Sequence, residues 1–172
     1  MHKPIVFLGT NTNLLMFTET AERAGRQVLG IIDDNYYGNT DEICGLPVLA
    51  SEQQFTDSEF LDRYRSSYEF YVATNWSTDP GHRSDTEKRR RLIDLVYHYD
   101  LHCANIIDPS AEISRHASLG QGIFIGVQGY VEPNVVIKDF AQIKSSSREH
   151  EFLMWSDNCC RYLIVESTSY TV

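Results

Sequence analysis

Residues 109–143 read PSAEISRHASLGQGIFIGVQGYVEPNVVIKDFAQI, and this stretch decides the fold. An aliphatic residue recurs at every sixth position, in the series Ile113, Leu119, Ile125, Val131, Ile137 and Ile143. The positions four residues further on are mostly small or β-branched: Ala117, Ile123, Gly129, Val135, Ala141 and Ser147. A period of six fits neither a helix nor an alternating strand, and it is typical of a parallel β-helix with three units in each triangular coil. A run of short antiparallel strands is the alternative.

The six-residue series stops after Ile143, because its next positions hold Glu149, Trp155, Arg161 and Ser167. Apolar residues continue at 152–154 and 163–165, but in a different frame. We therefore expect about two regular coils and an irregular C-terminal tail. The sequence pattern changes at Pro109, which predicts one domain over residues 1–108 and a second over residues 109–172.

The start of the chain predicts a strand, a helix and a second strand. Residues 5–8 form an aliphatic run that ends at Gly9, and apolar residues then recur at helical spacing from 14 to 24, with Gly25 suited to end the helix. Residues 28–32 form the second strand, which Asp33-Asp34-Asn35 closes. Such a βαβ unit is right-handed and places its ligand at the carboxyl ends of the strands.

The rest of the first domain continues the α/β pattern. We expect a short strand at 47–49, a short acidic helix near 52–60 capped by Ser51, and a strand at 70–73. A polar loop at 75–84, a helix at 85–99 with Leu92, Ile93, Val96 and Tyr97 as its apolar stripe, and a last strand at 103–107 follow. The predicted fold is therefore a Rossmann-like α/β domain with a parallel sheet, followed by a short parallel β-helix.

Composition excludes several classes of partner. The net charge is -9 and the pI about 5.0, whereas a protein that binds duplex nucleic acid needs a basic face. The one basic run, Lys88-Arg89-Arg90-Arg91, is interpreted as a solvated helix face. No segment reaches the roughly 18 apolar residues of a membrane span, and no leader is visible, so we expect a cytoplasmic protein. The four cysteines lack metal-binding spacing, which predicts reduced thiols and no metal site.

Several short motifs, in a fixed order, carry a family resemblance. They are Gly9 after the first strand, Ile32-Asp33-Asp34-Asn35, Gly45-Leu46-Pro47-Val48-Leu49, Ala73-Thr74-Asn75, Arg89-Arg90-Arg91-Leu92-Ile93, Ile106-Ile107-Asp108-Pro109-Ser110-Ala111, and finally the six-residue repeats. In this order the chain resembles the NeuD- and PglD-like sugar O- and N-acyltransferases. The resemblance implies a left-handed β-helix, a homotrimer, a nucleotide-sugar substrate and acetyl-CoA as the acyl donor.

In that family the N-terminal domain binds the nucleotide-sugar. The resemblance implies contacts from the turn Gly9, Thr10 and Asn11, from Asp33 or Asp34 with Asn35, and from Thr74 and Asn75. A turn at a helix N-terminus suits a diphosphate, and an acidic residue at a strand end suits a ribose or a base. The family's turn is rich in glycine, but here only Gly9 remains in Gly9-Thr10-Asn11-Thr12-Asn13, and side chains keep a phosphate further from the backbone.

The resemblance also places the chemistry in the β-helix. The stretch Ser146-Ser147-Arg148-Glu149-His150-Glu151 matches the family's catalytic segment, so His150 is the expected general base and Glu151 its partner. Imidazole accepts a proton at neutral pH because its pKa lies near 6.5. The relatives continue for several coils after this histidine, so we expect a shortened β-helix. Two alternatives remain: a non-catalytic relative that binds a nucleotide-sugar or only forms a trimer, and a plain nucleotide-binding module.

Overall fold

The computed structural model describes residues 2–74, 83–143 and 148–149, with the backbone alone for 83–85 and 148–149. The chain divides into two compact units, Met1–Ala104 and Asn105–Val172. We call them the sheet unit and the coil unit. The division falls after Ala104, whereas the sequence predicted a boundary at 108/109, and Ile106–Ile107 pairs with Phe124–Ile125 of the coil unit. Of the strand predicted at 103–107, Ile106–Ile107 forms a strand of the coil unit, and Cys103 bridges Phe70 in the sheet unit.

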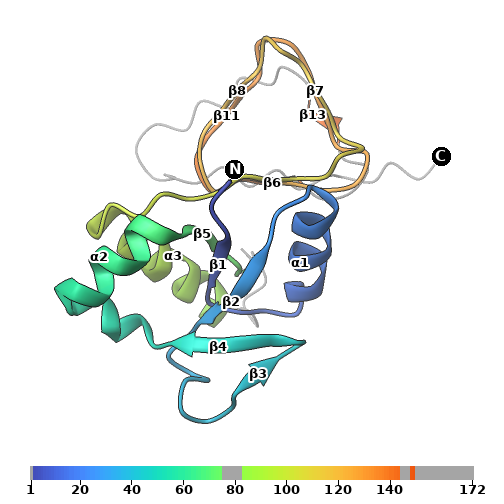
Figure 1. Ribbon diagram of the computed structural model, residues 1–172. Helices are drawn as coiled ribbons and strands as arrows, with labels where there is room; N and C mark the ends of the chain where they lie inside the picture. Colours follow the sequence, from blue (N-terminus) through green and yellow to red (C-terminus); the bar gives the residue numbers. More distant parts are fainter. Residues whose placement is uncertain (1, 75–82, 144–147, 150–172) are drawn as a thin grey trace. The chain divides into compact units, whose positions relative to one another are not determined.

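The sheet unit is built on one five-stranded sheet, which has α1 on one side and α2 and α3 on the other (Figure 1). Its strands are β1 (Ile5–Leu8), β2 (Val28–Ile32), β3 (Glu42–Ile43), β4 (Leu46–Ala50) and β5 (Glu69–Val72), in the order β3-β4-β2-β1-β5. All neighbours pair in parallel except β3 with β4. The prediction of an α/β domain with a parallel sheet is confirmed.

Four helices are described in the sheet unit, and not all of them begin at a side-chain cap. They are α1 (Leu14–Arg23), the 3-10 helix η1 (Glu52–Thr56), α2 (Ser58–Ser67) and α3 (Arg83–His98). Ser51 and Gln54 form a reciprocal capping box at the start of η1. The Asp57 carboxylate accepts the N–H groups of Glu59 and Phe60 and starts α2. The single acidic helix predicted near 52–60 is therefore wrong, since Asp57 caps a second helix within it.

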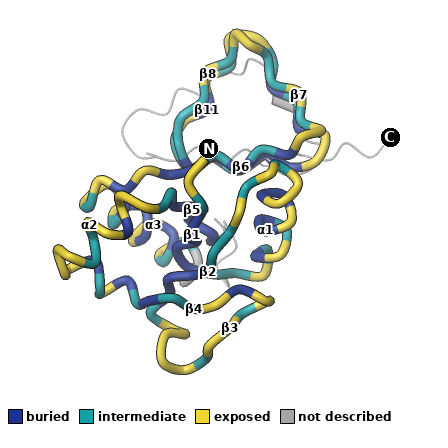
Figure 2. The backbone as a smooth tube through the Cα atoms, in the orientation of Figure 1, coloured by how far each residue is buried: buried dark blue, intermediate teal, exposed yellow. Residues whose placement is uncertain are grey.

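The core of the sheet unit lies on both faces of its central strands: β1 is buried along its length and β2 over its last three residues (Figure 2). Adjacent residues of β5 point to opposite faces: Phe70 meets Phe55 of η1 at 5.9 Å between ring centroids, and Tyr71 meets Phe17 of α1 at 5.2 Å. Helix α3 adds Leu92, Ile93 and Val96, as predicted. Tyr97, also assigned to that stripe, is 44% exposed.

The coil unit winds short parallel strands into a triangle (Figure 1). Its strands are β6 (Ile106–Ile107), β7 (Glu112–Ile113), β8 (Ser118–Leu119), β9 (Phe124–Ile125), β10 (Tyr130–Val131), β11 (Val136–Ile137), β12 (Gln142–Ile143) and β13 (Arg148–Glu149). They form three parallel sheets, β13-β10-β7, β11-β8 and β12-β9-β6. Residues 18 positions apart pair, as Ile107, Ile125 and Ile143 do. The pairing reaches Glu149, one strand beyond the aliphatic series.

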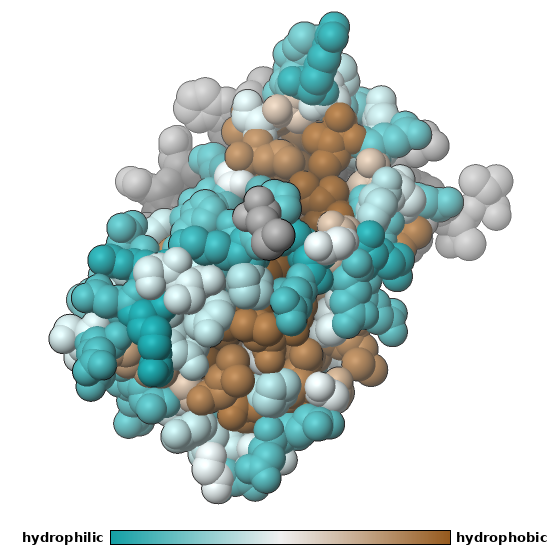
Figure 3. Space-filling model, in the orientation of Figure 1, coloured by the Kyte–Doolittle hydropathy of each residue, from teal (hydrophilic) through white to brown (hydrophobic). Residues whose placement is uncertain are grey.

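Aliphatic side chains fill the interior of the coil. Ile123, Ile125, Val131, Ile137, Ala141 and Ile143 are buried there, and Ile107, Ile113 and Leu119 of the first coil are partly buried against them. Figure 3 looks into this first coil and shows its apolar side chains gathered together. The corners of the second coil use left-handed backbone, with φ of 56° at Gln128, 66° at Asn134 and 62° at Phe140. In the described residues no helix has the length and apolar character to cross a membrane.

Candidate functional site

The candidate site is the edge of the sheet unit where the parallel strands β1, β2, β4 and β5 have their carboxyl ends. Strands β2 and β4 lie on one side of β1 and strand β5 lies on the other, so the winding of the chain reverses at β1. Open parallel sheets bind ligands outside the carboxyl ends of their strands at such a reversal. We call this region, made of residues 9–13, 33–35, 51–52, 73–74 and residues 88–91 of α3, the carboxyl edge.

The turn after β1 requires glycine at its first position. Gly9 has a φ of +72°, and a Cβ there would lie 2.6 Å from Leu92 Cδ1 and 2.8 Å from Thr74 Cγ2. Two residues later, Asn11 Oδ1 accepts the Asn13 N–H at 2.7 Å. Asn11 Nδ2 is buried and has no hydrogen-bond partner in the part of the chain that the structure describes. The turn therefore has one amide donor, Asn11 Nδ2, that no described residue binds.

Asp33 lies at the centre of the carboxyl edge and is fully buried. Its Oδ2 accepts from Lys88 Nζ at 2.6 Å and from Thr10 Oγ1 at 3.2 Å. Its Oδ1 accepts the Asn35 N–H at 3.0 Å. One carboxylate therefore joins the turn after β1, the end of β2 and helix α3, and its oxygens are engaged by these three donors.

Asp34 lies beside it but keeps partial contact with solvent, at 26% side-chain exposure. Its Oδ1 accepts from Ser51 Oγ at 2.6 Å and from the Glu52 N–H at 2.7 Å, and Oδ2 lies 3.5 Å from Arg91 Nη1. Partial burial acts to raise the pKa of Asp34, but the hydrogen bonds from Ser51 and Glu52, with the Arg91 charge, outweigh it and lower the pKa. Asp34 is therefore held in its ionised form and stays partly accessible to solvent.

Glu52 is the second acid beside Arg91, and its side chain is 2% exposed. Its Oε2 pairs with the Arg91 guanidinium, and its Oε1 has no hydrogen-bond partner within the described residues. Burial raises the pKa of Glu52 to about 7; the Arg91 charge opposes this rise and the Asp34 charge adds to it. Glu52 therefore changes its protonation near neutral pH.

The basic run on α3 is solvated only in part: Arg90 and Arg91 are exposed, but the interpretation as a solvated face is wrong for Lys88 and Arg89. Lys88 binds Asp33, and Arg91 binds Asp34 and Glu52. Arg89 is 2% exposed, and its Nη1 donates to the carbonyls of Val72 at 3.1 Å and Thr74 at 2.6 Å. The basic run and the two aspartates carry opposite charges. This complementarity is visible in the sequence and could have predicted that they pair.

The structure brings together most residues that the sequence assigned to substrate binding. Gly9, Thr10, Asp33, Asn35 and Thr74 lie at the carboxyl edge, joined by the contacts above. Asn11 lies in the same turn as Gly9, and Asp34 accepts from Ser51, the residue that follows β4. The sequence missed Lys88, Arg91 and Glu52. Asn75 and the predicted catalytic pair His150 and Glu151 lie outside the described residues. Within the described ranges, no group of three or more His, Cys, Asp or Glu could hold a metal ion.

No family model and no curated protein matches the chain. Solved structures do match. A variant of perosamine N-acetyltransferase from Caulobacter crescentus, in complex with CoA and GDP-perosamine, aligns with a TM-score of 0.66 and 20% identity over 84% of this chain and 61% of that one. The acetyltransferase domain of PglB from Neisseria gonorrhoeae aligns at 0.61 and 18%, over 86% and 67%. WeeI from Acinetobacter baumannii aligns at 0.59 and 16%, over 84% and 62%.

These similarities define the fold that the chain shares. It is a mixed α/β fold with parallel sheets, and it is the fold of acetyltransferases, one of which is named for a sugar amine. The chain spans 61% of the length of that perosamine N-acetyltransferase.

Proposed function

We propose that the chain binds a nucleotide-sugar at its carboxyl edge and takes part in the transfer of an acetyl group from acetyl-CoA to that sugar. One observation carries this proposal: three basic side chains and a glycine-dependent turn meet at the reversal point of a parallel sheet. Such an edge suits a phosphorylated ligand. The fold is shared with an enzyme solved with CoA and GDP-perosamine, which supports both substrates.

Each part of the nucleotide-sugar has a proposed partner. Gly9, Thr10 and Asn11 face its diphosphate from the turn after β1, and the unpartnered Asn11 Nδ2 supports this role. Asp34 accepts hydrogen bonds from the ribose or the base, and Asn35 can donate to them or accept from them. Asp34 suits this role better than Asp33, because it is ionised and 26% exposed, whereas Asp33 is fully buried. Thr74 and Asn75 are assigned to the same ligand by the resemblance.

The proposed chemistry lies in the coil unit. The amine or hydroxyl of the sugar attacks the carbonyl carbon of the acetyl thioester while His150 takes its proton and Glu151 holds the imidazole. The C–S bond then breaks, the acetyl group stays on the sugar, and coenzyme A leaves as a thiol after protonation. In this proposal the sheet unit is a Rossmann-like domain, the coil is left-handed, and the protein assembles as a homotrimer.

Calorimetry and thermal shift against acetyl-CoA, coenzyme A and a panel of UDP-, dTDP- and GDP-sugars test the proposal. A ligand that binds only the folded state raises the melting temperature. Binding of both acetyl-CoA and one nucleotide-sugar is expected. Binding of the nucleotide-sugar alone would leave a sugar-binding protein without acyl transfer, and binding of neither would overturn the proposed function.

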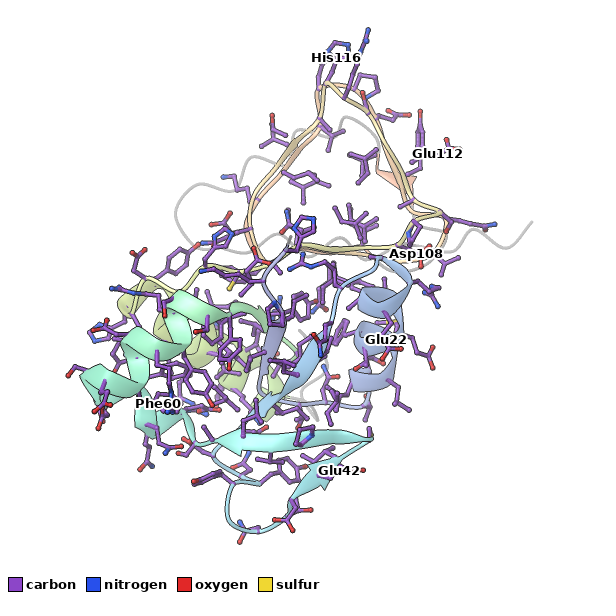
Figure 4. The ribbon with its side chains drawn as sticks, in the orientation of Figure 1. Glu22, Glu42, Phe60, Asp108, Glu112 and His116 are labelled. Carbon is purple, nitrogen blue, oxygen red and sulfur yellow. The ribbon has the colours of Figure 1, made fainter. Side chains whose placement is uncertain are left out.

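A matched pair of histidine variants then tests catalysis. His150→Ala is expected to lower the release of coenzyme A from acetyl-CoA by about 100-fold, a typical contribution of a general base. His116→Ala is the control, because His116 lies at a corner of the first coil and points away from its interior, as does Glu112 (Figure 4). Equal activity of the two variants would remove His150 from the mechanism.

A further inference from the structure

We infer that Lys88 binds the diphosphate of the nucleotide-sugar, and that its side-chain charge replaces the backbone N–H groups that a glycine-rich turn would offer. This inference rests on the proposed function, because it assigns one residue to the phosphate groups of that ligand. The residue that holds Lys88 in place is Asp33, which is then a positioning residue and not a ligand-binding one.

The position of Lys88 is the first support. It lies on α3, yet its Cε would be 3.3 Å from a Cβ built on Gly9, so the end of the side chain lies directly against the turn after β1. Its Nζ lies 2.6 Å from Asp33 Oδ2, at the end of the adjacent strand β2. The ammonium group therefore lies at the two strand ends where a diphosphate would meet the sheet.

The bonding capacity of Lys88 is the second support. An ammonium group has three donors, and the bond to Asp33 uses one of them. The side chain is 16% exposed, so the group is held firmly but is not sealed from solvent. Asp33, by contrast, is 0% exposed and is engaged by Thr10 and Asn35 as well as Lys88. Lys88 can bind an anion without breaking its ion pair, whereas Asp33 cannot reach a ligand without losing these bonds.

The sequence of the turn is the third support. Thr10, Asn11, Thr12 and Asn13 carry side chains where glycines would let a phosphate approach the backbone. Arg89 is buried and donates to the Val72 and Thr74 carbonyls, and Arg91 pairs with Asp34 and with Glu52 of η1. Lys88 is the cation of this set that adjoins the turn, and Asn11 Nδ2 adds a neutral donor beside it.

The test compares nucleoside diphosphates with nucleosides by calorimetry. GDP and UDP report the diphosphate contact, and guanosine and uridine report the base and the ribose alone. One of the two nucleoside diphosphates, GDP or UDP, is expected to bind the unaltered protein. Lys88→Met should weaken the binding of that nucleotide by about tenfold or more, because a charge-assisted bond to phosphate is lost, and should leave nucleoside binding unchanged. Lys138→Met, at an exposed position in the coil unit, is the control and should bind as the unaltered protein does.

The outcomes separate this inference from the proposed function. If the unaltered protein binds no nucleotide at all, the proposed function fails and the role of Lys88 fails with it. If the unaltered protein and Lys88→Met bind GDP or UDP equally well, the role of Lys88 is overturned while nucleotide binding stands.

Two further variants guard against a folding defect, since Lys88→Met leaves a buried carboxylate without its cation. The double variant K88M/D33N removes both charges and should fold, yet should show the same loss of diphosphate binding. Asp33→Asn alone keeps the ammonium group but weakens the contact that holds it, so the gain that GDP or UDP shows over its nucleoside should fall, by less than in Lys88→Met. A loss of guanosine and uridine binding in Asp33→Asn would instead make Asp33 a ribose ligand and overturn its positioning role.

Discussion

The coil unit and the carboxyl edge of the sheet unit are held together by opposite kinds of contact. In the coil, each strand pairs with residues 18 positions away, and each apolar side chain stacks on an equivalent one, as Ile125 does between Ile107 and Ile143. At the edge, each ion pair is unique and joins distant parts of the chain, such as Lys88 with Asp33 and Arg91 with Glu52. The repeated contacts of the coil unit build a regular scaffold. A binding site such as the carboxyl edge depends on contacts that each occur only once.

The difference also concerns the kind of energy involved. The coil is stabilised by apolar burial, which depends on shape and volume and is insensitive to pH. The edge depends on charges at low exposure, whose contribution changes with protonation. Four predictions follow from this comparison.

The largest expected effect is in the coil. Ile125→Ala should destabilise the protein by about 2–5 kcal/mol, because it opens a cavity between two stacked isoleucines. Denaturation by urea, followed by circular dichroism, measures this loss. Val127→Ala is the control, since Val127 is 36% exposed and its truncation should cost well under 1 kcal/mol. Similar losses at the two positions would contradict the stacked interior.

The second prediction concerns the turn at the carboxyl edge. Gly9→Ala should destabilise the protein by about 2–3 kcal/mol for two reasons. The added methyl group would overlap Leu92 and Thr74, and a residue with a Cβ is disfavoured at the positive φ of this position. Gly38→Ala isolates the backbone part of that loss, since Gly38 has a φ of +78° and nothing within 4 Å of its Cβ position. It should cost about 1 kcal/mol in the same urea titration. Equal losses would mean that close packing does not restrict Gly9.

The third prediction concerns pH. The fold raises the pKa of Glu52 from 4.5 to about 7, so it favours the protonated acid. The stabilising contribution is complete below pH 4.5 and is lost as pH rises through 7, on the order of 1–3 kcal/mol. Glu52→Gln, a neutral mimic of the acid, should remove this part of the pH dependence, as measured by melting temperature from pH 5 to 8.

Glu42→Gln is the matched control for that experiment, because Glu42 is exposed on β3. It should keep the slope of the unaltered protein. A Glu52→Gln protein that loses stability between pH 5 and 8 as steeply as the unaltered one would show that Glu52 does not titrate in this range.

The smallest expected effect is at a corner of the coil. Gln128 has a φ of 56°, which costs a residue with a side chain more than it costs glycine. Gln128→Gly should therefore raise the free energy of unfolding by about 0.5–1 kcal/mol, measured by urea denaturation. Lys138→Gly, at an exposed position without positive φ, should lower it by a similar amount. A loss at both positions would mean that the corner carries no strain.

Much of the fold could be predicted from local patterns in the sequence. The runs at 5–8 and 28–32 are strands β1 and β2, and the six-residue series supplies the buried and half-buried residues of the coil. The predictions fail where contacts between residues distant in sequence decide which strand a segment pairs with. By its sequence, Ile106–Ile107 could be a strand of either unit. Only its pairing with β9 shows that it belongs to the coil unit.

The candidate site was predictable in its location but not in its bonding. Strand ends and the reversal of a parallel sheet indicate where Gly9 and the two aspartates lie. The sequence did not indicate that Asp33 would be buried by Thr10 and Lys88 while Asp34 stayed partly exposed. Adjacent identical residues carry the same local signal, and they differ here because α3 packs against one of them more closely than the other.

The sequence by itself determined the coil, because a period of six repeats the same local environment and leaves each residue one suitable place. It also determined the α/β alternation of the sheet unit. Only the tertiary structure decided that three residues of the basic run, Lys88, Arg89 and Arg91, would lie at the carboxyl edge. The reason is that charge pairs act over a few ångströms in space, and residues 33 and 88 come that close only after the sheet and α3 have packed together.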